Sequence, residues 1–181
     1  MKPKSSNTVR IIGGEFRSRL LRFADLPGLR PTPDRVRETL FNWLGQDLAG
    51  WRCLDAFAGS GALGFEAASR GAERVLMLER DSRAAANLRE QARALPAPAV
   101  EVLQADALGY LAGTGEAFDL ILLDPPFDRD WIDVALQHAA TRLGPGGKIY
   151  AESPGDLAPQ GYKVLRRGRA GLSHFCLLEP A

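Results

Sequence analysis

The sequence is poor in the residue types that most often bind metals or form covalent cross-links. It has two cysteines, Cys53 and Cys176, and two histidines, His138 and His174. The cysteines lie far apart and have no second pair of ligands, so they predict neither a disulfide framework nor a zinc site. We therefore expect reduced thiols, a cytoplasmic location and no bound metal.

Long apolar runs are also missing. No uninterrupted apolar stretch approaches the roughly 18 residues that a membrane-spanning helix needs. The basic residues at the N-terminus are followed by no apolar segment, so we do not expect a secretory signal peptide. Hydrophobic residues make up 45% of the chain and charged residues 25%, which is typical of a soluble globular protein. We expect a soluble monomer with no membrane partner.

The formal net charge is only +1, but the basic residues are concentrated near the two ends of the chain. Residues 1–37 hold nine Lys or Arg residues against three acids, a net charge of +6, and no acid interrupts the basic cluster at residues 163–169. A basic periphery around an acidic middle indicates contact with a polyanion, although similar charge runs occur on solvated faces that bind nothing. The basic residues are Lys2, Lys4, Arg10, Arg17, Arg19, Arg22, Arg30, Arg35 and Arg37, and then Lys163, Arg166, Arg167 and Arg169.

From residue 51 onward, short apolar runs alternate with segments of helical pattern. This alternation predicts an α/β fold with an open, mostly parallel sheet and helices on both faces. The last two strands are joined by a short glycine-containing turn, so we expect an antiparallel hairpin at one sheet edge. We expect Ser82 to cap the second helix and the segment 144–147 to end the last one. Strands are expected at 53–57, 74–79, 100–104, 118–124, 148–152, 162–166 and 172–179, and helices at 62–70, 82–95, after 106 and at 131–143.

The first fifty residues have a different pattern. Residues 9–12, Gly13-Gly14 and residues 16–23 predict a β-hairpin with arginines on its face. A helix should follow, with Thr32 as its N-cap and Pro33 at its first position. Its apolar stripe comprises Val36, Leu40, Trp43 and Leu44. We interpret residues 1–50 as an N-terminal extension and residues 51–181 as one compact domain.

A glycine-rich loop beginning with Gly59 and Gly61 follows the first strand of this domain and opens a helix. Glycine lets the backbone approach a ligand there, and the helix start offers free N–H donors. Glu79 ends the next strand, where a carboxylate could accept both hydroxyls of a ribose. This pattern alone also fits a nicotinamide-dependent oxidoreductase. Asp55 distinguishes a nicotinamide cofactor from S-adenosylmethionine. A carboxylate four residues before Gly59 would repel the pyrophosphate of the first but attract the ammonium and sulfonium groups of the second.

Asp106 completes the predicted cofactor site. It ends the third strand, where its carboxylate could accept a hydrogen bond from the adenine amino group. Asp55 and Asp106 could instead simply cap the helices that follow them. We assign Phe57 and Ala107, which adjoin these acids in sequence, to the same cofactor pocket.

The segment Asp124-Pro125-Pro126-Phe127 follows the fourth strand, at the edge where the other acids are expected. An exocyclic base amine is a weak nucleophile, and two acceptors on its two N–H groups would align it and localise its lone pair. The Asp124 carboxylate and the Pro125 carbonyl can be these acceptors, because two consecutive prolines hold the backbone rigidly. Phe127 offers a face on which a base can stack. The segment therefore predicts methylation of a base amine.

Four segments carry a resemblance to a known family. They are Arg10–Gly14, Arg30–Leu44, Leu54–Gly61 and Asp124–Phe127. With them the sequence resembles the bacterial family of 16S ribosomal RNA guanine-N2 methyltransferases over nearly its whole length. The glycine loop and the Asp-Pro-Pro element are shared with many amino-methyltransferases, including adenine-N6 enzymes.

This resemblance implies a class I, Rossmann-like methyltransferase fold with a seven-stranded sheet. It also implies a guanine in 16S rRNA as substrate, within a small ribosomal subunit that is being assembled. The neighbourhood of Thr32 should close over S-adenosylmethionine, and the N-terminal hairpin should contact RNA through Arg10, Arg17, Arg19 and Arg22. The alternatives are adenine-N6 methylation of DNA or RNA, a nicotinamide-dependent oxidoreductase, and an RNA-binding assembly factor without catalysis.

Overall fold

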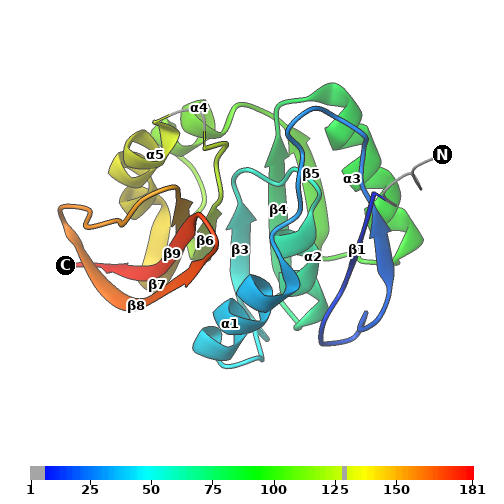
Figure 1. Ribbon diagram of the computed structural model, residues 1–181, viewed down its shortest axis with the longest axis horizontal. Helices are drawn as coiled ribbons and strands as arrows, with labels where there is room; N and C mark the ends of the chain where they lie inside the picture. The colour runs from blue at the N-terminus through cyan, green and yellow to red at the C-terminus, as the bar shows by residue number, and fades with distance from the viewer. Residues whose placement is uncertain (1–6, 128–129) are drawn as a thin grey trace.

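The computed structural model describes residues 7–127 and 130–181, so Lys2, Lys4, Asp128 and Arg129 lie outside the described residues. A seven-stranded sheet and a separate two-stranded sheet form the β structure (Figure 1). The strands are β1 Thr8–Arg10, β2 Leu20–Arg22, β3 Arg52–Asp55, β4 Arg74–Glu79, β5 Val100–Gln104, β6 Phe118–Leu123, β7 Leu143–Ser153, β8 Tyr162–Ala170 and β9 Ser173–Pro180. The helices are α1 Asp34–Leu44, α2 Ala62–Ser69, α3 Ser82–Ala94, α4 Ala107–Ala112, α5 Trp131–Ala139 and the short 3-10 helix η1 Ala140–Arg142.

The large sheet has the strand order β5-β4-β3-β6-β7-β9-β8. Its first five strands run parallel, and β9 pairs antiparallel with both β7 and β8. The predicted α/β class and the antiparallel edge hairpin are therefore confirmed. Because β3 and β6 are neighbours in the centre while the chain winds outward from them, the strand ends beside β3 form the crevice where open α/β sheets bind ligands.

Two apolar layers cover the two faces of the sheet. Residues of α1, α2 and α3 pack on one face together with Cys53, Val75 and Leu122. Residues of α4 and α5 pack on the other face with Leu54 and Ile121. The strands alternate between these two clusters because successive side chains of a strand point to opposite faces.

The N-terminal hairpin is present, but its connection is longer than expected. Strand β1 pairs with β2 antiparallel, and the second strand begins at Leu20 instead of residue 16. Residues 14–19 form turns instead, because the Glu15 N–H donates to the carbonyl of Ser69 at the end of α2 (2.7 Å). Phe16 and Leu21 are buried in the cluster that contains α1 and α2. The hairpin therefore shares the hydrophobic core of the sheet.

Three local expectations were wrong. Pro33, not Thr32, is the N-cap of α1, and the Thr32 hydroxyl bonds elsewhere. Asp81, not Ser82, caps α3, because its carboxylate accepts from the N–H groups of Arg83 and Ala84. The segment 144–147 does not close the last helix: α5 ends earlier, η1 follows, and β7 begins at residue 143 with an irregular stretch opposite β6.

Candidate active site

Four acidic residues gather at the carboxyl ends of the parallel strands. Asp55 ends β3, Glu79 ends β4, Asp124 follows β6 and Glu152 lies one residue before the end of β7. The pairing of β3 with β6, and of β6 with β7, brings Asp55, Asp124 and Glu152 together on neighbouring strands at one edge. The first three acids were predicted from the sequence, and Glu152 was not.

The glycine loop lies against this edge. Gly59 and Gly61 both have positive φ, 52° and 82°, and Gly61 is the N-cap of α2. The Gly59 N–H donates to Oε2 of Glu79 (2.9 Å), which fixes the loop to the end of β4. A Cβ atom on Gly59 would lie 3.0 Å from a methyl group of Leu29. The segment before α1 therefore passes directly over the glycine loop.

Asp55 is a buried acid with an incomplete set of partners. Its carboxylate accepts from the N–H of Gly64 (3.0 Å) through Oδ2, while Oδ1 has no hydrogen-bond partner among the described residues. Its side chain is only 1% exposed. Burial, opposed by the backbone N–H groups of Gly64 and Phe57 and reinforced by the negative charge of Glu79, raises the pKa of Asp55 to about 7. A buried carboxylate oxygen without a donor fits a cationic ligand such as the ammonium end of S-adenosylmethionine.

Asp106 and Glu79 both bond the backbone and remain accessible. Asp106 is the N-cap of α4, and its Oδ2 accepts from the N–H of Gly109 (2.8 Å). Oε1 of Glu79 accepts from the N–H of Asp81 (2.9 Å). Capping does not exclude ligand binding, since a carboxylate has about four lone-pair sites. Ala107, the first residue of α4, is buried behind Asp106.

The Asp124–Phe127 segment meets the N-terminal region of the chain. The Thr32 hydroxyl donates to Oδ2 of Asp124 (3.1 Å), across 92 positions of sequence. Burial, followed by the negative charge of Glu152, raises the pKa of Asp124 well above its usual range. Pro125 is buried, whereas Phe127 is 42% exposed and free to receive a flat ligand.

Glu152 is the residue that the sequence analysis missed. It is 4% exposed, and it accepts from the hydroxyl groups of Tyr150 and Ser173 (3.1 Å for Ser173). It lies beside Asp124, because the paired residues Leu123 and Ala151 directly precede the two acids on β6 and β7, and its charge acts on the pKa of Asp124. A signal was available, because Glu152 ended the predicted strand at 148–152, and parallel strands of one sheet end at the same edge.

Aromatic side chains flank the other side of the site. The rings of Phe57 and Trp131 stack with their centroids 6.1 Å apart, and the Arg80 guanidinium lies 5.7 Å from the Trp131 ring centroid. Phe57 follows β3 directly, beside Asp55. The structure thus places Phe57 close to the predicted cofactor residues.

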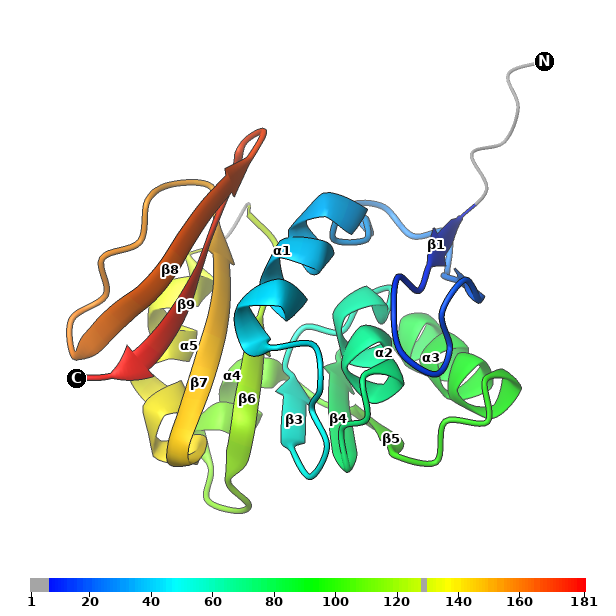
Figure 2. The same cartoon turned by 90° about the horizontal axis from the view of Figure 1, so that it is seen from below.

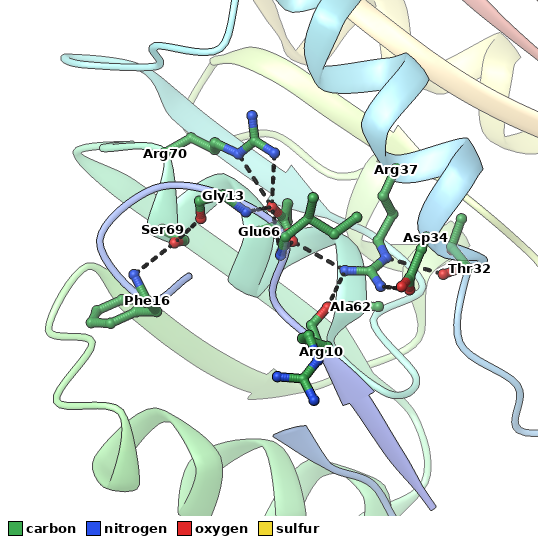
Figure 3. Close-up of polar contacts among 12 residues, drawn as sticks. Arg10, Gly13, Phe16, Thr32, Asp34, Arg37, Ala62, Glu66, Ser69 and Arg70 are labelled. Atoms are coloured by element: carbon green, nitrogen blue, oxygen red, sulfur yellow. Dashed lines mark hydrogen bonds and ion pairs between the residues drawn. The ribbon is translucent and has the colours of Figure 1, made fainter. Parts of the chain in front are cut away.

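A buried ion-pair network positions the segment that carries Thr32 (Figure 3). The Arg37 guanidinium donates to the carbonyls of Thr32 (3.1 Å) and Arg10 (2.9 Å) and to the carboxylate of Glu66 (3.0 Å). Arg37 and Glu66 are both fully buried. Glu66 also accepts from Arg70 and from the N–H groups of Ile12 and Gly13, so one acid of α2 joins the N-terminal loop to α1.

Two of the predicted RNA-binding arginines, Arg17 and Arg19, lie away from the strand-end edge. The loop that carries Arg17 is hydrogen-bonded to Ser69, the last residue of α2. The glycine loop lies at the other end of this helix, before its first residue. Helix α2 runs back from the site toward the opposite edge, so Arg17 is at the far end of that helix. Arg19 donates weakly to the carbonyl of Ala94 at the end of α3 (3.4 Å). Arg10 and Arg22 lie on the paired strands β1 and β2 (Figure 2).

Within residues 7–127 and 130–181, no group of three or more His, Cys, Asp or Glu side chains is arranged to hold a metal ion. No helix in this part of the chain is long and apolar enough to cross a membrane.

Comparisons with known proteins agree with this architecture. The family model described as conserved hypothetical protein 95 matches residues 9–179. Ribosomal RNA small subunit methyltransferase D of Escherichia coli (strain K12) is 45% identical over 156 residues, which cover 84% of this chain and 79% of that protein. The solved structure of yhhF from Escherichia coli superposes with a TM-score of 0.86 at 38% identity, over 96% of this chain and 98% of that one.

A more distant structure shares the fold alone. Magnesium protoporphyrin IX methyltransferase from Synechocystis PCC 6803, solved with bound SAM, has a TM-score of 0.66 at 16% identity and covers 81% of this chain and 79% of its own. The parallel sheet, the glycine loop and the strand-end acids thus occur in a chain whose fold is that of class I methyltransferases. Together with the family match over residues 9–179, they make this chain a methyltransferase of the conserved hypothetical protein 95 family.

Proposed function

We propose that the protein transfers a methyl group from S-adenosylmethionine to the exocyclic N2 amine of a guanine in 16S rRNA. The observation that carries the proposal is the position of Asp124 and Pro125. They lie at the sheet edge beside Asp55, whose buried Oδ1 lacks a partner among the described residues. One acid is thus available for the cationic cofactor, and the neighbouring acid for the amine.

The cofactor would lie along the ends of β3, β4 and β5. Oδ1 of Asp55 would accept from its ammonium group, and Glu79 would accept from the ribose hydroxyls. Asp106 would accept from the adenine amino group. The site would be completed by Gly59 and Gly61, which allow close backbone approach, and by Phe57, Ala107 and Thr32 around it.

Asp124 and Pro125 would prepare the amine for attack. Their carboxylate and carbonyl oxygens would accept from its two N–H groups and hold the nitrogen in line, while Phe127 stacks on the base. The bound sulfonium supplies the methyl group. As the N–C bond forms, the C–S bond breaks with its electron pair passing to sulfur, and the surplus proton on nitrogen passes to Asp124.

The substrate assignment rests on relatives and on charge. Curated relatives are named ribosomal RNA small subunit methyltransferase D, and the chain spans 79% of the Escherichia coli protein. We further propose that residues 1–50 serve as the RNA-binding extension of the catalytic domain at 51–181, with Arg10, Arg17, Arg19 and Arg22 contacting phosphates of an assembling small subunit. Phosphate contacts fix the position of a protein on RNA without selecting a base.

A modification map tests the proposal directly. Mass spectrometry of 16S rRNA from a bacterial strain lacking this gene should show the loss of one N2-methylguanine, which the intact gene restores and an Asp124→Asn variant does not. In vitro, labelled methyl transfer is then compared on precursor small subunits, naked 16S rRNA and DNA. An unchanged map would refute the guanine assignment. Transfer to adenine in DNA or RNA would replace it with N6 methylation.

A further inference from the structure

Among the described residues, no group of opposite charge bonds the Glu152 carboxylate. Its two oxygens accept from the neutral hydroxyls of Tyr150 and Ser173, and the carboxyl group of Asp124 lies next to it at the end of the adjacent strand. Tyr150 is itself fully buried, and its pKa is raised well above its usual value by burial and by the charge of Glu152. Tyr150 therefore stays a hydroxyl and donates to Glu152.

Within residues 7–127 and 130–181, the groups facing Asp124 from each neighbouring element are neutral or acidic. Strand β3 contributes Asp55, β7 contributes Glu152 and Tyr150, and Thr32 before α1 contributes a hydroxyl. Cys176 of β9 belongs to the apolar cluster on the other face of the sheet from Tyr150. The nearby guanidinium of Arg37 points away, toward Glu66, Asp34 and two carbonyls. Two carboxyl groups that lie side by side in such surroundings do not both ionise, so they share one proton.

We propose that Glu152 is a positioning residue for methyl transfer, which holds the Asp124 carboxyl group through the proton that the two share and keeps it a strong acceptor for the substrate amine. The inference rests on the proposed amine methylation, but not on the identity of the base. The bonds from Tyr150 and Ser173 fix Glu152, Glu152 fixes one side of Asp124, and Thr32 fixes another. Asp124 is thereby aimed from two sides.

The shared proton also gives the reaction a route for the surplus proton. Attack leaves a proton on the methylated nitrogen, and this proton passes to Asp124 once the pair is ionised. Cationic charge bound beside Asp55 favours that ionised form. Glu152 then takes part in holding the proton until solvent accepts it, so no other base is required.

The pH dependence of kcat/KM tests the role of Glu152, because its acid limb reports ionisation in the free enzyme. Glu152→Gln keeps the size and the hydrogen-bonding capacity of the side chain but removes its charge. We expect the acid limb to move to lower pH by at least about one unit, since a like charge no longer opposes ionisation of Asp124. The plateau should fall about tenfold, because a weaker base is a weaker acceptor. Glu179→Gln, a change on β9 at a half-exposed acid that pairs with Lys163, should leave both the acid limb and the plateau unchanged.

A second measurement does not depend on turnover. Calorimetric titration of S-adenosylmethionine in buffers of different ionisation enthalpy counts the protons released on binding. The wild type should release more protons than Glu152→Gln, because the variant has lost the shared proton. Tyr150→Phe keeps the charge of Glu152 and serves if Glu152→Gln does not fold; it should lower the plateau and leave proton release close to wild type.

Two results would overturn the proposal: an acid limb of Glu152→Gln that coincides with wild type while activity falls equally at every pH, or equal proton release by the two proteins. Failure of the proposed function is a separate outcome. If wild type methylates no nucleic acid, the kinetic arm is lost, but the calorimetric arm still decides whether Asp124 and Glu152 share a proton.

Discussion

Helix α2 contacts two buried carboxylates that differ in their surroundings. Glu66, in the middle of the helix, accepts from two guanidinium groups and two backbone N–H groups. Asp55, which accepts from the first turn of the same helix, has one bonded oxygen and one without a partner among the described residues. Both acids are at most 1% exposed. The two acids are equally buried but differently surrounded. Glu66 therefore holds the fold together, whereas Asp55 is suited to binding a ligand.

The difference follows from the cost of burying charge. A buried carboxylate is tolerated when cations and hydrogen-bond donors replace the water it loses, as they do around Glu66. At the strand ends the donors are few and neutral, and Asp55 and Asp124 respond with raised pKa values. In their ionised form, these two carboxylates destabilise the free protein and stabilise its complex with a cation.

Removing the charge of Glu66 should have the largest effect. Glu66→Gln removes the buried carboxylate that pairs with Arg37 and leaves it the exposed carboxylate of Asp34. Breaking a buried pair in this way costs about 3–5 kcal/mol. Urea denaturation followed by circular dichroism should show this loss. Glu38→Gln, an exposed change on α1, is the matched control. A loss below about 1 kcal/mol would mean that the network in Figure 3 contributes little to stability.

At the strand ends the corresponding change should reduce activity and spare the fold. Asp124→Asn removes an acceptor that the transition state requires, so transfer should fall by about 10²–10³-fold. Its unfolding free energy should be equal to or above that of the wild type, because a poorly solvated acid has been neutralised. Asp133→Asn on the exposed face of α5 serves as control. Strongly weakened S-adenosylmethionine binding in Asp124→Asn would instead place Asp124 in the cofactor pocket.

These two regions were not equally predictable from the sequence. The strand-end acids and the glycine loop follow from local patterns, since a parallel strand, its final acid and the next turn are contiguous in the chain. Glu66 and Arg37 were not recognised because charged residues in amphipathic helices are normally solvated, and only tertiary packing buries this pair. The bond from Thr32 to Asp124 has no local signal for the same reason. Asp81 was passed over in favour of Ser82 because adjacent residues are equally good caps.

The pKa of Asp55 predicts how stability varies with pH in the absence of ligand. Its folded-state pKa is raised from 3.8 to about 7, so the protonated form stabilises the fold at low pH. That contribution is lost as pH rises from about 4 through 7, and it amounts to about 4 kcal/mol. Asp55→Asn should therefore be more stable than wild type at pH 8 and show a flatter stability profile between pH 4 and 8.

Thermal unfolding with and without S-adenosylmethionine completes this test. Bound S-adenosylmethionine should stabilise the wild type at pH 8 more than it stabilises Asp55→Asn, because the variant has no carboxylate charge to attract the ammonium group of the cofactor. Equal stabilisation of the two proteins would remove Asp55 from the cofactor site. A stability profile of Asp55→Asn that parallels wild type would show that its carboxyl group is better solvated than its burial indicates.

Replacing exposed arginines should have the smallest effect on stability. Such variants also show which of the two basic regions binds RNA. Unlike Arg37, the side chains of Arg17, Arg19 and Arg22 are exposed, so replacing them with alanine should leave stability within about 0.5 kcal/mol. If they contact phosphates, RNA binding weakens and the slope of log K against log salt falls by about 0.7–0.9 per contact. The matched variant replaces Arg166, Arg167 and Arg169 on β8, whose strand ends at the same edge as Asp124. An unaltered slope in the first variant and a reduced slope in the second would transfer the RNA interface from the N-terminal hairpin to the edge hairpin.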